Sequence, residues 1–467
     1  MAQGSQPSIE DTGPGPRRGT NAMSKNKVVG ADVLENGEKR GKAGVLRFFL
    51  RNGPLAIAAS SLPGFVNYFI ILYLTYRSSA AEVGDYRILM SFFALAGLVS
   101  VQESSKVVIR STAMNDRDSY ATIFLIRLVF SSAALVATLL VWALSDAIGW
   151  DFPPAGLIPI VLMSALFYPL DIFNSYFQAK RQFMTMSLVA LAKYLMALVV
   201  FMVALWLGAS AFQATLWQIA SMVLFHLVFF ANWIGRDVWE SLRASFDVIG
   251  RLKSKPSRES IVLSIANLLP SSLEHVDKIV IGSVFGLEAL GLYTLGFSTG
   301  RFIYNALKPA LYIYYAQFVE KMPTVRMLWA VMVVFTLFGL ALTGAFLWSV
   351  DNLAFMHKFQ GTKLVTAIMF LSYGVAMVDA IYLQAYAINK DTNSNHLLVS
   401  NTISGFGCLL LFAAASQTTA YTAMIICSMH YPIRHGATVM IVSALRRREE
   451  SRRLVDGSKP SAELSAT

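Results

Sequence analysis

The stretch "SSLEHVDKIVIGSVFGLEALGLYTLGFSTGRFIYNALKP", from Ser271 to Pro309, decides the fold because it is apolar enough for a lipid bilayer and still carries charge. Its ionisable side chains belong to Glu274, His275, Asp277, Lys278, Arg301 and Lys308. A charge at the centre of a bilayer costs about 2.5 to 3.5 kcal/mol on the insertion scale. These groups must therefore face a cavity or one another, which predicts membrane helices around a polar interior.

The rest of the chain shares this composition. Of its 467 residues, 55% are hydrophobic and only 14% are charged, whereas a soluble domain has about 25% charged residues. Apolar runs long enough to cross a hydrocarbon core of about 30 Å recur about twelve times. Their approximate centres are Ile70, Phe93, Val136, Leu166, Leu195, Leu224, Ile279, Gly300, Phe338, Phe370, Ser404 and Ile426. We therefore expect an all-α integral membrane protein.

Basic residues are sorted between the two sides of the membrane. The N-terminal region, the segment "RDVWESLRASFDVIGRLKSKPSR" and the C-terminal "LRRREESRR" fall on one side, which the positive-inside rule makes cytoplasmic. Opposite loops such as "SDAIGWDFPP" and "LGASAF" carry no Lys or Arg, with Arg77 and Lys358 as the main exceptions. We expect both termini in the cytoplasm. The net charge of +11 then reflects this bias and attraction to anionic lipid, and it does not indicate nucleic-acid binding.

The two halves of the chain repeat each other at a spacing of 207 residues, a period typical of duplicated architecture. The matched pairs are Pro63 with Pro270, Gly84 with Gly291, Tyr86 with Tyr293 and, one residue later in register, Asp171 with Asp379. Each half holds an even number of helices, so both halves have the same orientation. We expect two pseudo-symmetric six-helix lobes around a central cleft, with transport by alternating access.

The expected boundaries follow from this duplication. They are a disordered cytoplasmic tail over residues 1–45, an N-lobe over 46–237, a basic cytoplasmic linker over 238–258, a C-lobe over 259–445 and a cytoplasmic tail over 446–467. Pro63 and Pro270 lie in the first helix of each half and are candidate bending points, although a static kink explains them equally well. Cys408 and Cys427 lie in apolar spans and suggest neither a disulfide framework nor a metal site.

Basic groups in the spans outnumber acidic ones, which suggests a cleft that accepts an anionic group. The candidate ligands of that group are Arg301, Arg434, Lys193 and Lys278, and the candidate coupling or structural acids are Asp277, Glu274, Asp171 and Asp379. Glu274 and Arg301 lie at similar depth on two antiparallel helices joined near Leu287, so they are expected to pair.

The same residues also have structural explanations. Glu274 and Lys278 form an i, i+4 pair that can be purely structural. Arg301, Tyr304, Asn305 and Lys308 follow one helical face and predict a cationic stripe. Lys308 can instead extend to the cytoplasmic interface.

The segment "LPSSLEHVDKIVIGSVFGLEALGLYTLGFS" resembles the start of the second half of the oligosaccharide flippases of polysaccharide biosynthesis, in which an Asp-basic pair in an apolar helix precedes "G-x-Y". The segment "AAEVGDYRILMSFFALAGLVSVQESSKVVIR" looks like the matching part of the first half. The likeness covers residues from about 46 to about 445. Asp277 and Lys278 fall on the family's motif and Gly291 and Tyr293 complete it, whereas the first half has Ile70 in place of the acid.

This resemblance implies a fold of two six-helix lobes, shared with multidrug and toxin extruders and with lipid II flippases. It implies translocation of a polyprenyl-pyrophosphate-linked oligosaccharide across the bacterial inner membrane, with that lipid as the principal partner. A coupling cation, either proton or sodium, and the polysaccharide polymerase and export machinery are further expected partners. The sequence contains no nucleophile-base set, phosphate loop or metal-ligand cluster, so we expect neither enzyme activity nor a cofactor or metal.

Three other functions compete with this interpretation. A cation-coupled multidrug exporter of the same fold would use deep acids such as Asp171 and Asp379, but the surplus of basic groups argues against a cationic substrate. A membrane glycosyltransferase or polymerase would need an active site in outer loops that are too short here. A channel fits the duplicated lobes less well than alternating access does.

Overall fold

The structure is a computed structural model. It describes residues 61–101, 104, 107, 118–148, 157–172, 175–177, 182–244, 247–307, 322–388, 392 and 395–455. Within these residues all regular structure is helical. The predicted tail over residues 1–45 lies outside the described part of the chain.

A helix over residues 61–77 comes first in the described chain. It is followed by α3 (Ala80–Val99), α5 (Asp118–Ile148), α6 (Leu157–Leu170), α8 (Phe183–Trp206), α9 (Ala211–Phe229), the π-helical turn η1 (Phe230–Ile234), α10 (Gly235–Ala244), α11 (Val248–Lys253), α12 (Lys255–Leu307), α14 (Val325–Asn352), the 3-10 helix η3 (Ala354–Thr362), α15 (Lys363–Leu371), α16 (Tyr373–Ile388), α17 (Asn395–Ala415) and α18 (Ala420–Val455).

All twelve predicted span centres lie in these helices. Seven described helices are long and apolar enough to cross a membrane, or eight if the bent pair at residues 354–386 is one span. This number is lower than the twelve predicted spans because one helix contains two spans and two other helices carry several polar groups. α12 is counted once although Gly286, with φ of 87°, divides it into two spans. α3 contains three charged residues, and Arg434 and two histidines lower the hydropathy of α18.

Local signals explain several helix ends. Ser210 accepts a hydrogen bond from the Gln213 amide, and the Gln213 side chain accepts one from the Ser210 amide, which is a complete capping box at the start of α9. Thr324 caps the start of α14 in the same way through the Met327 amide. α9, η1 and α10 follow without a break, so the predicted linker over 238–258 is largely helical where the structure describes it.

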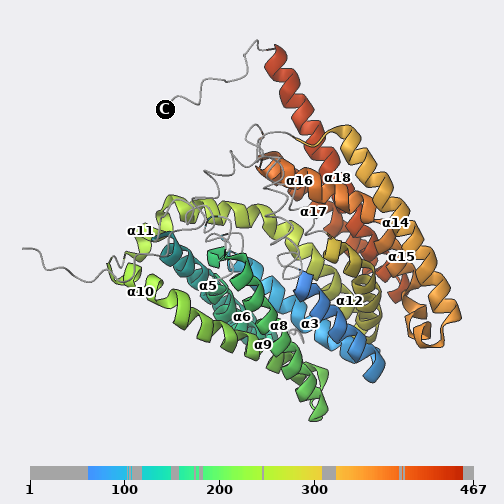
Figure 1. Ribbon diagram of the computed structural model, residues 1–467, viewed down its shortest axis with the longest axis horizontal. Coiled ribbons are helices and arrows are strands. Elements are labelled where there is room, and N and C mark those ends of the chain that lie inside the picture. Colours follow the sequence, from blue (N-terminus) through green and yellow to red (C-terminus); the bar gives the residue numbers. More distant parts are fainter. Residues whose placement is uncertain are drawn as a thin grey trace, which may run out of the picture. The chain divides into compact units, whose positions relative to one another are not determined.

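Two groups of helices pack against each other. α5, α6, α8 and α9 form one group, which we call the N-lobe together with α3 and the helix over 61–77, and α14 to α18 form the other with α12, the C-lobe (Figure 1). Within the lobes α8 packs on α9, and α17 packs on α18. The main contact between the lobes is made by α3 and α12.

The contact between α3 and α12 follows the sequence repeat. A methyl group at Gly84 would collide with the Leu287 carbonyl oxygen, and one at Gly291 would collide with the Ala80 carbonyl oxygen. Ala80 and Leu287 are themselves 207 residues apart. Each repeat therefore presents the same pair of positions to the other, which is the pattern of a two-fold contact. The two glycines let the helix backbones touch directly.

Further contacts join the lobes at this end of α3, which we call the crossing end. The Lys358 ammonium donates hydrogen bonds to the Thr75 and Tyr76 carbonyl oxygens at 3.0 and 3.3 Å. Tyr76 donates its hydroxyl proton to the Phe355 carbonyl oxygen at 2.9 Å. A lysine suits the C-terminal end of a helix, where carbonyl groups lack partners. These contacts give Lys358, an exception to the charge pattern, a structural role.

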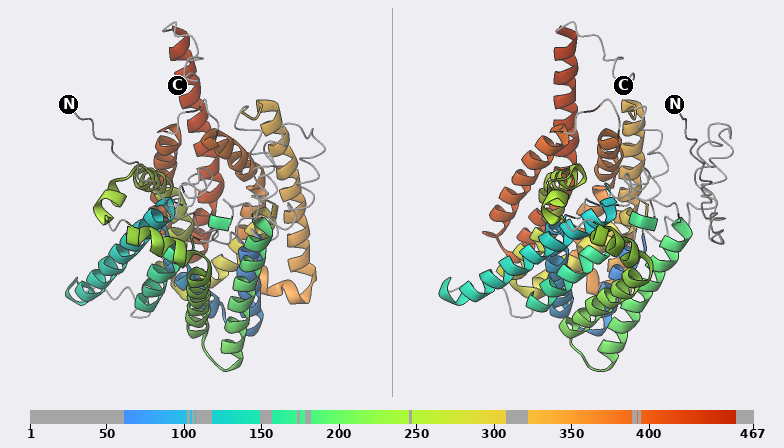
Figure 2. Two further views of the ribbon diagram at one scale, coloured as in Figure 1. Left: turned by 60° about the vertical axis from the view of Figure 1, so that its left-hand side comes forward. Right: turned by 90° about the vertical axis from the view of Figure 1, so that its left-hand side faces the viewer.

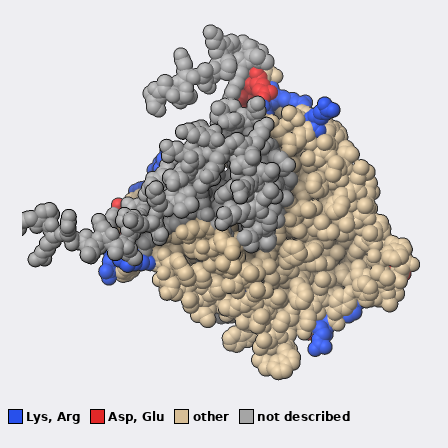
Figure 3. All heavy atoms as spheres, viewed as in Figure 1, with Lys and Arg blue, Asp and Glu red and all other residues tan. Residues whose placement is uncertain are grey.

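The surface of the molecule is that of a membrane protein. Where Figure 3 shows described residues, the face is almost free of charged atoms except at its margins. Apolar side chains stay exposed on the helices, as with Leu337 on α14 at 60% and Leu410 on α17 at 72%. The charged C-terminal turns of α18 extend past the neighbouring helices (Figure 2). The chain is therefore an all-α, multi-pass membrane protein.

Candidate functional site

A small cavity lies between the two lobes, away from the crossing end. Its volume is about 70 Å³. The helix over 61–77 contributes Asn67 and Tyr68, α3 contributes Arg87, and α12 contributes Arg301 and Asn305. The polar lining is thus supplied by the first two helices of the N-lobe and the second span of α12.

Arg87 is the least satisfied charge in this cavity. Its Nε atom is buried without a hydrogen-bond partner, and no described carboxylate lies within ion-pair distance of the guanidinium. Arg87 and Arg301 are close enough to interact electrostatically. Two arginines without an acid in the lining create a positive potential inside an apolar protein, which an anionic ligand would relieve.

Arg301 is held at the cavity wall by Glu274, as the equal depth of the two residues predicts. Two guanidinium nitrogens of Arg301 donate to the two Glu274 oxygens at 3.0 and 3.3 Å. Arg434 on α18 reaches the same carboxylate at 3.4 Å and donates to the Pro270 carbonyl oxygen at 2.6 Å. Glu274 is therefore shared by two arginines, of which only Arg301 lines the cavity.

The predicted Asp-Lys motif forms a closed unit inside the protein. Asp277 and Lys278 are both fully buried, and the Lys278 ammonium donates to both Asp277 oxygens at 2.9 Å. The third Lys278 proton goes to the Glu274 backbone oxygen at 2.7 Å, not to the Glu274 carboxylate, so the i, i+4 side-chain pair is not formed. Tyr293 donates its hydroxyl proton to Asp277 at 2.6 Å. Lys278 thus has no donor left for a ligand.

Asp171 and Lys193 meet inside the N-lobe rather than at the cavity. Lys193 is 2% exposed and its ammonium lies 3.9 Å from Asp171. His226 on α9 contacts the same carboxylate at 3.0 Å through Nε2, and its Nδ1 contacts the Met222 carbonyl oxygen at 2.8 Å. These residues come from the fourth, fifth and sixth predicted spans.

The C-lobe contains a matching acid-imidazole pair. His435 on α18 contacts Asp379 on α16 at 2.5 Å through Nδ1. The two aspartates are 208 residues apart in the chain and the two histidines are 209 residues apart. The repeat therefore extends from the sequence to these acid-imidazole pairs.

The predicted site residues thus separate into three places. Arg301 lines the cavity, Glu274 and Arg434 lie directly behind it, and the remaining ligands and acids lie deeper in one lobe or the other. The predicted stripe on α12 divides, because Asn305 lines the cavity while Tyr304 is buried against α16. Lys308 is outside the described residues. Pro270 lies in helical backbone, and the break in α12 comes at Gly286 instead.

Sequence reasoning missed Arg87 and His226, and it noted His435 only as a polar group of the twelfth span, without a role or a partner. The signal for Arg87 was present in "GDYR", which places an arginine well inside the second span. The histidines were visible at nearly the repeat spacing. Which acid each histidine would meet depends on the rotation of the helices about their axes, and weakly amphipathic membrane helices do not reveal that rotation.

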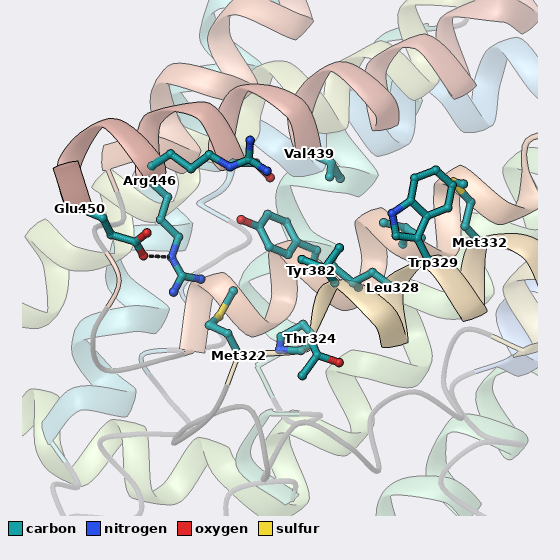
Figure 4. Close-up of a pocket in the computed structure, with 14 residues that line it drawn as sticks. Met322, Thr324, Leu328, Trp329, Met332, Tyr382, Val439, Arg446 and Glu450 are labelled. Carbon is teal, nitrogen blue, oxygen red and sulfur yellow. Dashed lines mark hydrogen bonds and ion pairs between the residues drawn. The ribbon is translucent and has the colours of Figure 1, made fainter.

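A larger hollow of about 490 Å³ lies between α14, α16 and α18. Figure 4 shows Leu328, Trp329 and Met332 along one wall and the ion pair of Arg446 and Glu450, joined at 2.8 Å, at one end. No group of three or more potential metal ligands occurs among the described residues. The hollow shares no lining residue with the cavity between the lobes.

Comparison with known proteins identifies the family. Residues 79–313, half of the chain, match the family described as "Polysaccharide biosynthesis protein". The chain belongs to this family. The matched region covers α3 and all of α12, and so includes Arg87, Glu274 and Arg301. The resemblance seen in the sequence is therefore confirmed at the level of the polysaccharide biosynthesis family.

Solved structures of another family share the fold. An outward-facing multidrug resistance MATE family transporter of the MOP superfamily is 15% identical to this chain, covers 85% of it and 96% of its own length, and has a TM-score of 0.53. An inward-facing transporter of the same description is 14% identical, with coverages of 84% and 95% and a TM-score of 0.53. At this identity the likeness concerns the fold. No curated protein matches this member of the polysaccharide biosynthesis family.

Proposed function

We propose that this protein is a flippase that moves a polyprenyl-pyrophosphate-linked oligosaccharide from the cytoplasmic to the outer leaflet of a bacterial inner membrane, in the biosynthesis of a cell-surface polysaccharide. It acts by alternating access and performs no enzymatic step. Both termini are cytoplasmic in this proposal, and residues 46–237 and 259–445 move as the two lobes.

The observation that carries this proposal is Arg87, which lies beside Arg301 in the cavity between the lobes and has no described carboxylate within ion-pair distance. A guanidinium binds phosphate oxygens through paired hydrogen bonds, so two of them suit a pyrophosphate. Asn67 and Asn305 add neutral hydrogen-bonding groups for the phosphate or the first sugar. The polyprenyl chain stays in the lipid, where the apolar lobe surfaces are exposed.

The size of the cavity favours a moving pair of lobes. Its volume of about 70 Å³ is far below the roughly 300 to 1,000 Å³ of pockets for drug-sized ligands. The crossing end is held shut by Lys358, Tyr76 and the glycine contacts. With the proposed orientation this end faces outwards, so the lobes separate first on the cytoplasmic side and admit the headgroup there.

The test is reconstitution of the purified protein in liposomes with a fluorescent polyprenyl-pyrophosphate-linked sugar, followed by chemical quenching of the outer leaflet. The wild type should move the lipid across the bilayer. Arg87→Gln should slow this by about ten- to hundredfold, the value of one charge-assisted phosphate contact, and Arg87→Lys by less. Arg87 suits the test because its removal leaves no buried acid unpaired.

The matched control is Arg326→Gln, since Arg326 is an exposed arginine at the start of α14 that does not line the cavity and pairs with no acid in the described part of the chain. It should flip the lipid at the wild-type rate. A wild type that moves no lipid but drives a cationic dye against an ion gradient would contradict the proposal and make the protein a multidrug exporter. The half-buried Asp171 and the buried Asp379 are the feature that such an exporter would use.

A further inference from the structure

Five ionisable groups form a continuous chain from the interior of the C-lobe to the cavity. His435 Nδ1 contacts Asp379 at 2.5 Å, and His435 Nε2 contacts Arg434 at 3.3 Å. Arg434 reaches Glu274 at 3.4 Å, and Glu274 holds Arg301 at 3.0 Å. The chain crosses three helices, α16, α18 and α12. Its last member, Arg301, lines the cavity between the lobes.

The partners of His435 define its protonation state in this geometry. A guanidinium can only donate hydrogen bonds, so the Nε2 atom that faces Arg434 must be the acceptor and carries no proton. The Nδ1 atom then carries the proton and donates it to Asp379. His435 is therefore neutral. Two carboxylates balance two guanidiniums, and the chain of five groups has no net charge.

In this series of five groups, a second proton would bind to the Nε2 atom of His435. On Nε2 it would turn His435 into a cation that faces the Arg434 guanidinium, and the two like charges would separate. Arg434 would then move towards Glu274, its carboxylate partner among the described residues, and Glu274 would hold Arg301 less tightly. Asp379 favours the extra proton, because its second oxygen, Oδ1, is buried without a partner among the described residues.

The other titratable neighbours do not supply a competing charge. The Tyr431 ring lies 4.4 Å from the His435 ring, and Cys408 on α17 lies within electrostatic range of Arg434. Tyr304 on α12 lies within electrostatic range of Asp379. The neutral forms of these three side chains are the stable ones in an apolar interior. The protonation of His435 therefore depends on the charges of Asp379, Arg434, Glu274 and Arg301.

We propose that the Asp379-His435 pair is a proton-binding site, and that a proton there and a pyrophosphate in the cavity bind cooperatively. This rests on the proposed function, since it takes the pyrophosphate as the ligand of Arg301. The proton releases Arg301 from Glu274 for the ligand, and the negative ligand offsets the charge that the proton adds. By linkage, each raises the affinity of the other by the same factor.

The N-lobe shows the same pair in the geometry of the protonated form. Both ring nitrogens of His226 face acceptors, Nδ1 the Met222 carbonyl oxygen and Nε2 the Asp171 carboxylate. Satisfying both requires two ring protons, which is the imidazolium form. The repeated pair is thus compatible with either protonation state, and the neighbour of the second nitrogen selects between them. In the C-lobe that neighbour is Arg434.

The test uses the full-length protein in lipid nanodiscs with 15N-labelled histidine. Nuclear magnetic resonance of the ring nitrogens distinguishes the neutral form protonated on Nδ1 from the imidazolium. Of the six histidines in the chain, the one whose signals vanish in His435→Asn should change between these forms from about pH 8 to about pH 5. Farnesyl pyrophosphate, a short polyprenyl pyrophosphate, should raise the midpoint by about one pH unit, which is a tenfold gain in proton affinity.

The second measurement is proton uptake from weakly buffered solution when farnesyl pyrophosphate binds. The wild type should take up about half a proton per ligand at a pH between the midpoints of the free and the ligand-bound protein, which is the most that a shift of about one pH unit allows. His435→Asn and Asp379→Asn should bind the ligand without that uptake. His396→Gln is the matched control, because His396 lies near the carboxylate of Glu449 in the same lobe but away from Arg434, and its uptake should equal that of the wild type.

The outcomes separate the two proposals. Ligand binding without proton uptake, or a His435 that stays neutral or stays imidazolium throughout, overturns the proton site and leaves the flippase assignment intact. A wild type that binds no farnesyl pyrophosphate and flips no lipid overturns the assignment and with it the cooperative binding. Uptake that persists in both His435→Asn and Asp379→Asn would place the proton elsewhere and overturn this inference.

Discussion

Single residues show how the two repeats have diverged. Asp277 and Lys278 form a fully buried ion pair, whereas the positions 207 residues earlier are Ile70 and Ile71, which are equally buried. One architecture therefore accommodates either an ion pair or two isoleucines at the same place. The pair is not required for the fold as such, because the N-lobe does without it. Removing only one partner of the ion pair should destabilise the protein, since it leaves an unpaired charge in an apolar interior.

This comparison predicts opposite effects of single and combined substitution. Asp277→Asn should destabilise the protein by about 3 to 5 kcal/mol, because Lys278 loses its counter-charge. The triple variant Asp277→Ile, Lys278→Ile and Tyr293→Phe should be neutral or more stable by about 1 to 4 kcal/mol. Its two isoleucines copy Ile70 and Ile71 of the N-lobe, and Tyr293→Phe removes the hydroxyl that would lose its acceptor, whereas the matching Tyr86 keeps its hydroxyl because it donates to Asn67. Thermal unfolding in detergent checks both. A triple variant as unstable as Asp277→Asn would show that the pair itself stabilises the fold.

The candidate site was only partly predictable at this scale. Glu274 and Arg301 were matched correctly from their distances to the turn at Leu287, because rise per residue fixes depth along a helix. The contacts that Arg434 and His435 make with other helices were not predicted, because the depth of a residue in the membrane does not show which helix lies opposite. Arg87 was overlooked because a count of acids and bases does not show which arginine lies, among the described residues, without a carboxylate within ion-pair distance. The sequence spacing predicts a pair within one helical hairpin, but it does not predict pairs between helices that are far apart in the chain.

At the scale of the helices, positions were easier to predict from the sequence than boundaries. All twelve predicted centres fell in helices, because apolar length is a strong signal. The boundaries between them were less predictable: α12 runs through two spans with only Gly286 marking the division, and the basic segment before it forms α10 and α11 rather than a loop. Charge density alone does not distinguish a surface helix from a linker.

The crossing of α3 and α12 gives a prediction for an element pair. Gly84→Ala should destabilise the protein by about 1 to 3 kcal/mol, because its methyl group meets the Leu287 backbone and the helices must move apart. Gly344→Ala on α14 is the control, since a methyl group there meets nothing within 4 Å. It should stabilise by about 0.5 to 1 kcal/mol through helix propensity. Equal melting temperatures for the two variants would mean that the crossing is not tightly packed.

At the scale of the molecule, Lys358 links the lobes at the crossing end. Its hydrogen bonds to the Thr75 and Tyr76 carbonyls exist only while that end is closed. Lys358→Ala should therefore shift the population towards the state open at this end, by up to about fivefold for an exposed charged contact. Cysteine labelling measures this shift. Cys408 and Cys427 are fully buried, so a cysteine placed at Ser298 in the cavity is read against a low background.

The experiment compares the rate at which an impermeant maleimide, added outside sealed vesicles, modifies Ser298→Cys with and without Lys358→Ala. Labelling should be faster with Lys358→Ala. Lys363→Ala is the matched control, because Lys363 pairs with Asp351 inside the C-lobe and does not bridge the lobes. Unchanged or slower labelling with Lys358→Ala would show that the contact does not hold this end closed.

The glycine crossing has a consequence for each half taken alone. Since Gly84 meets Leu287 while Gly291 meets Ala80, each repeat carries both parts of a self-complementary surface, the small residue and the backbone that it receives. A polypeptide made of one repeat would thus already possess what it needs to dimerise with a second copy of itself. The single chain is thus built like a homodimer whose two subunits are joined in one polypeptide, with the α3 to α12 contact in the place of the dimer interface.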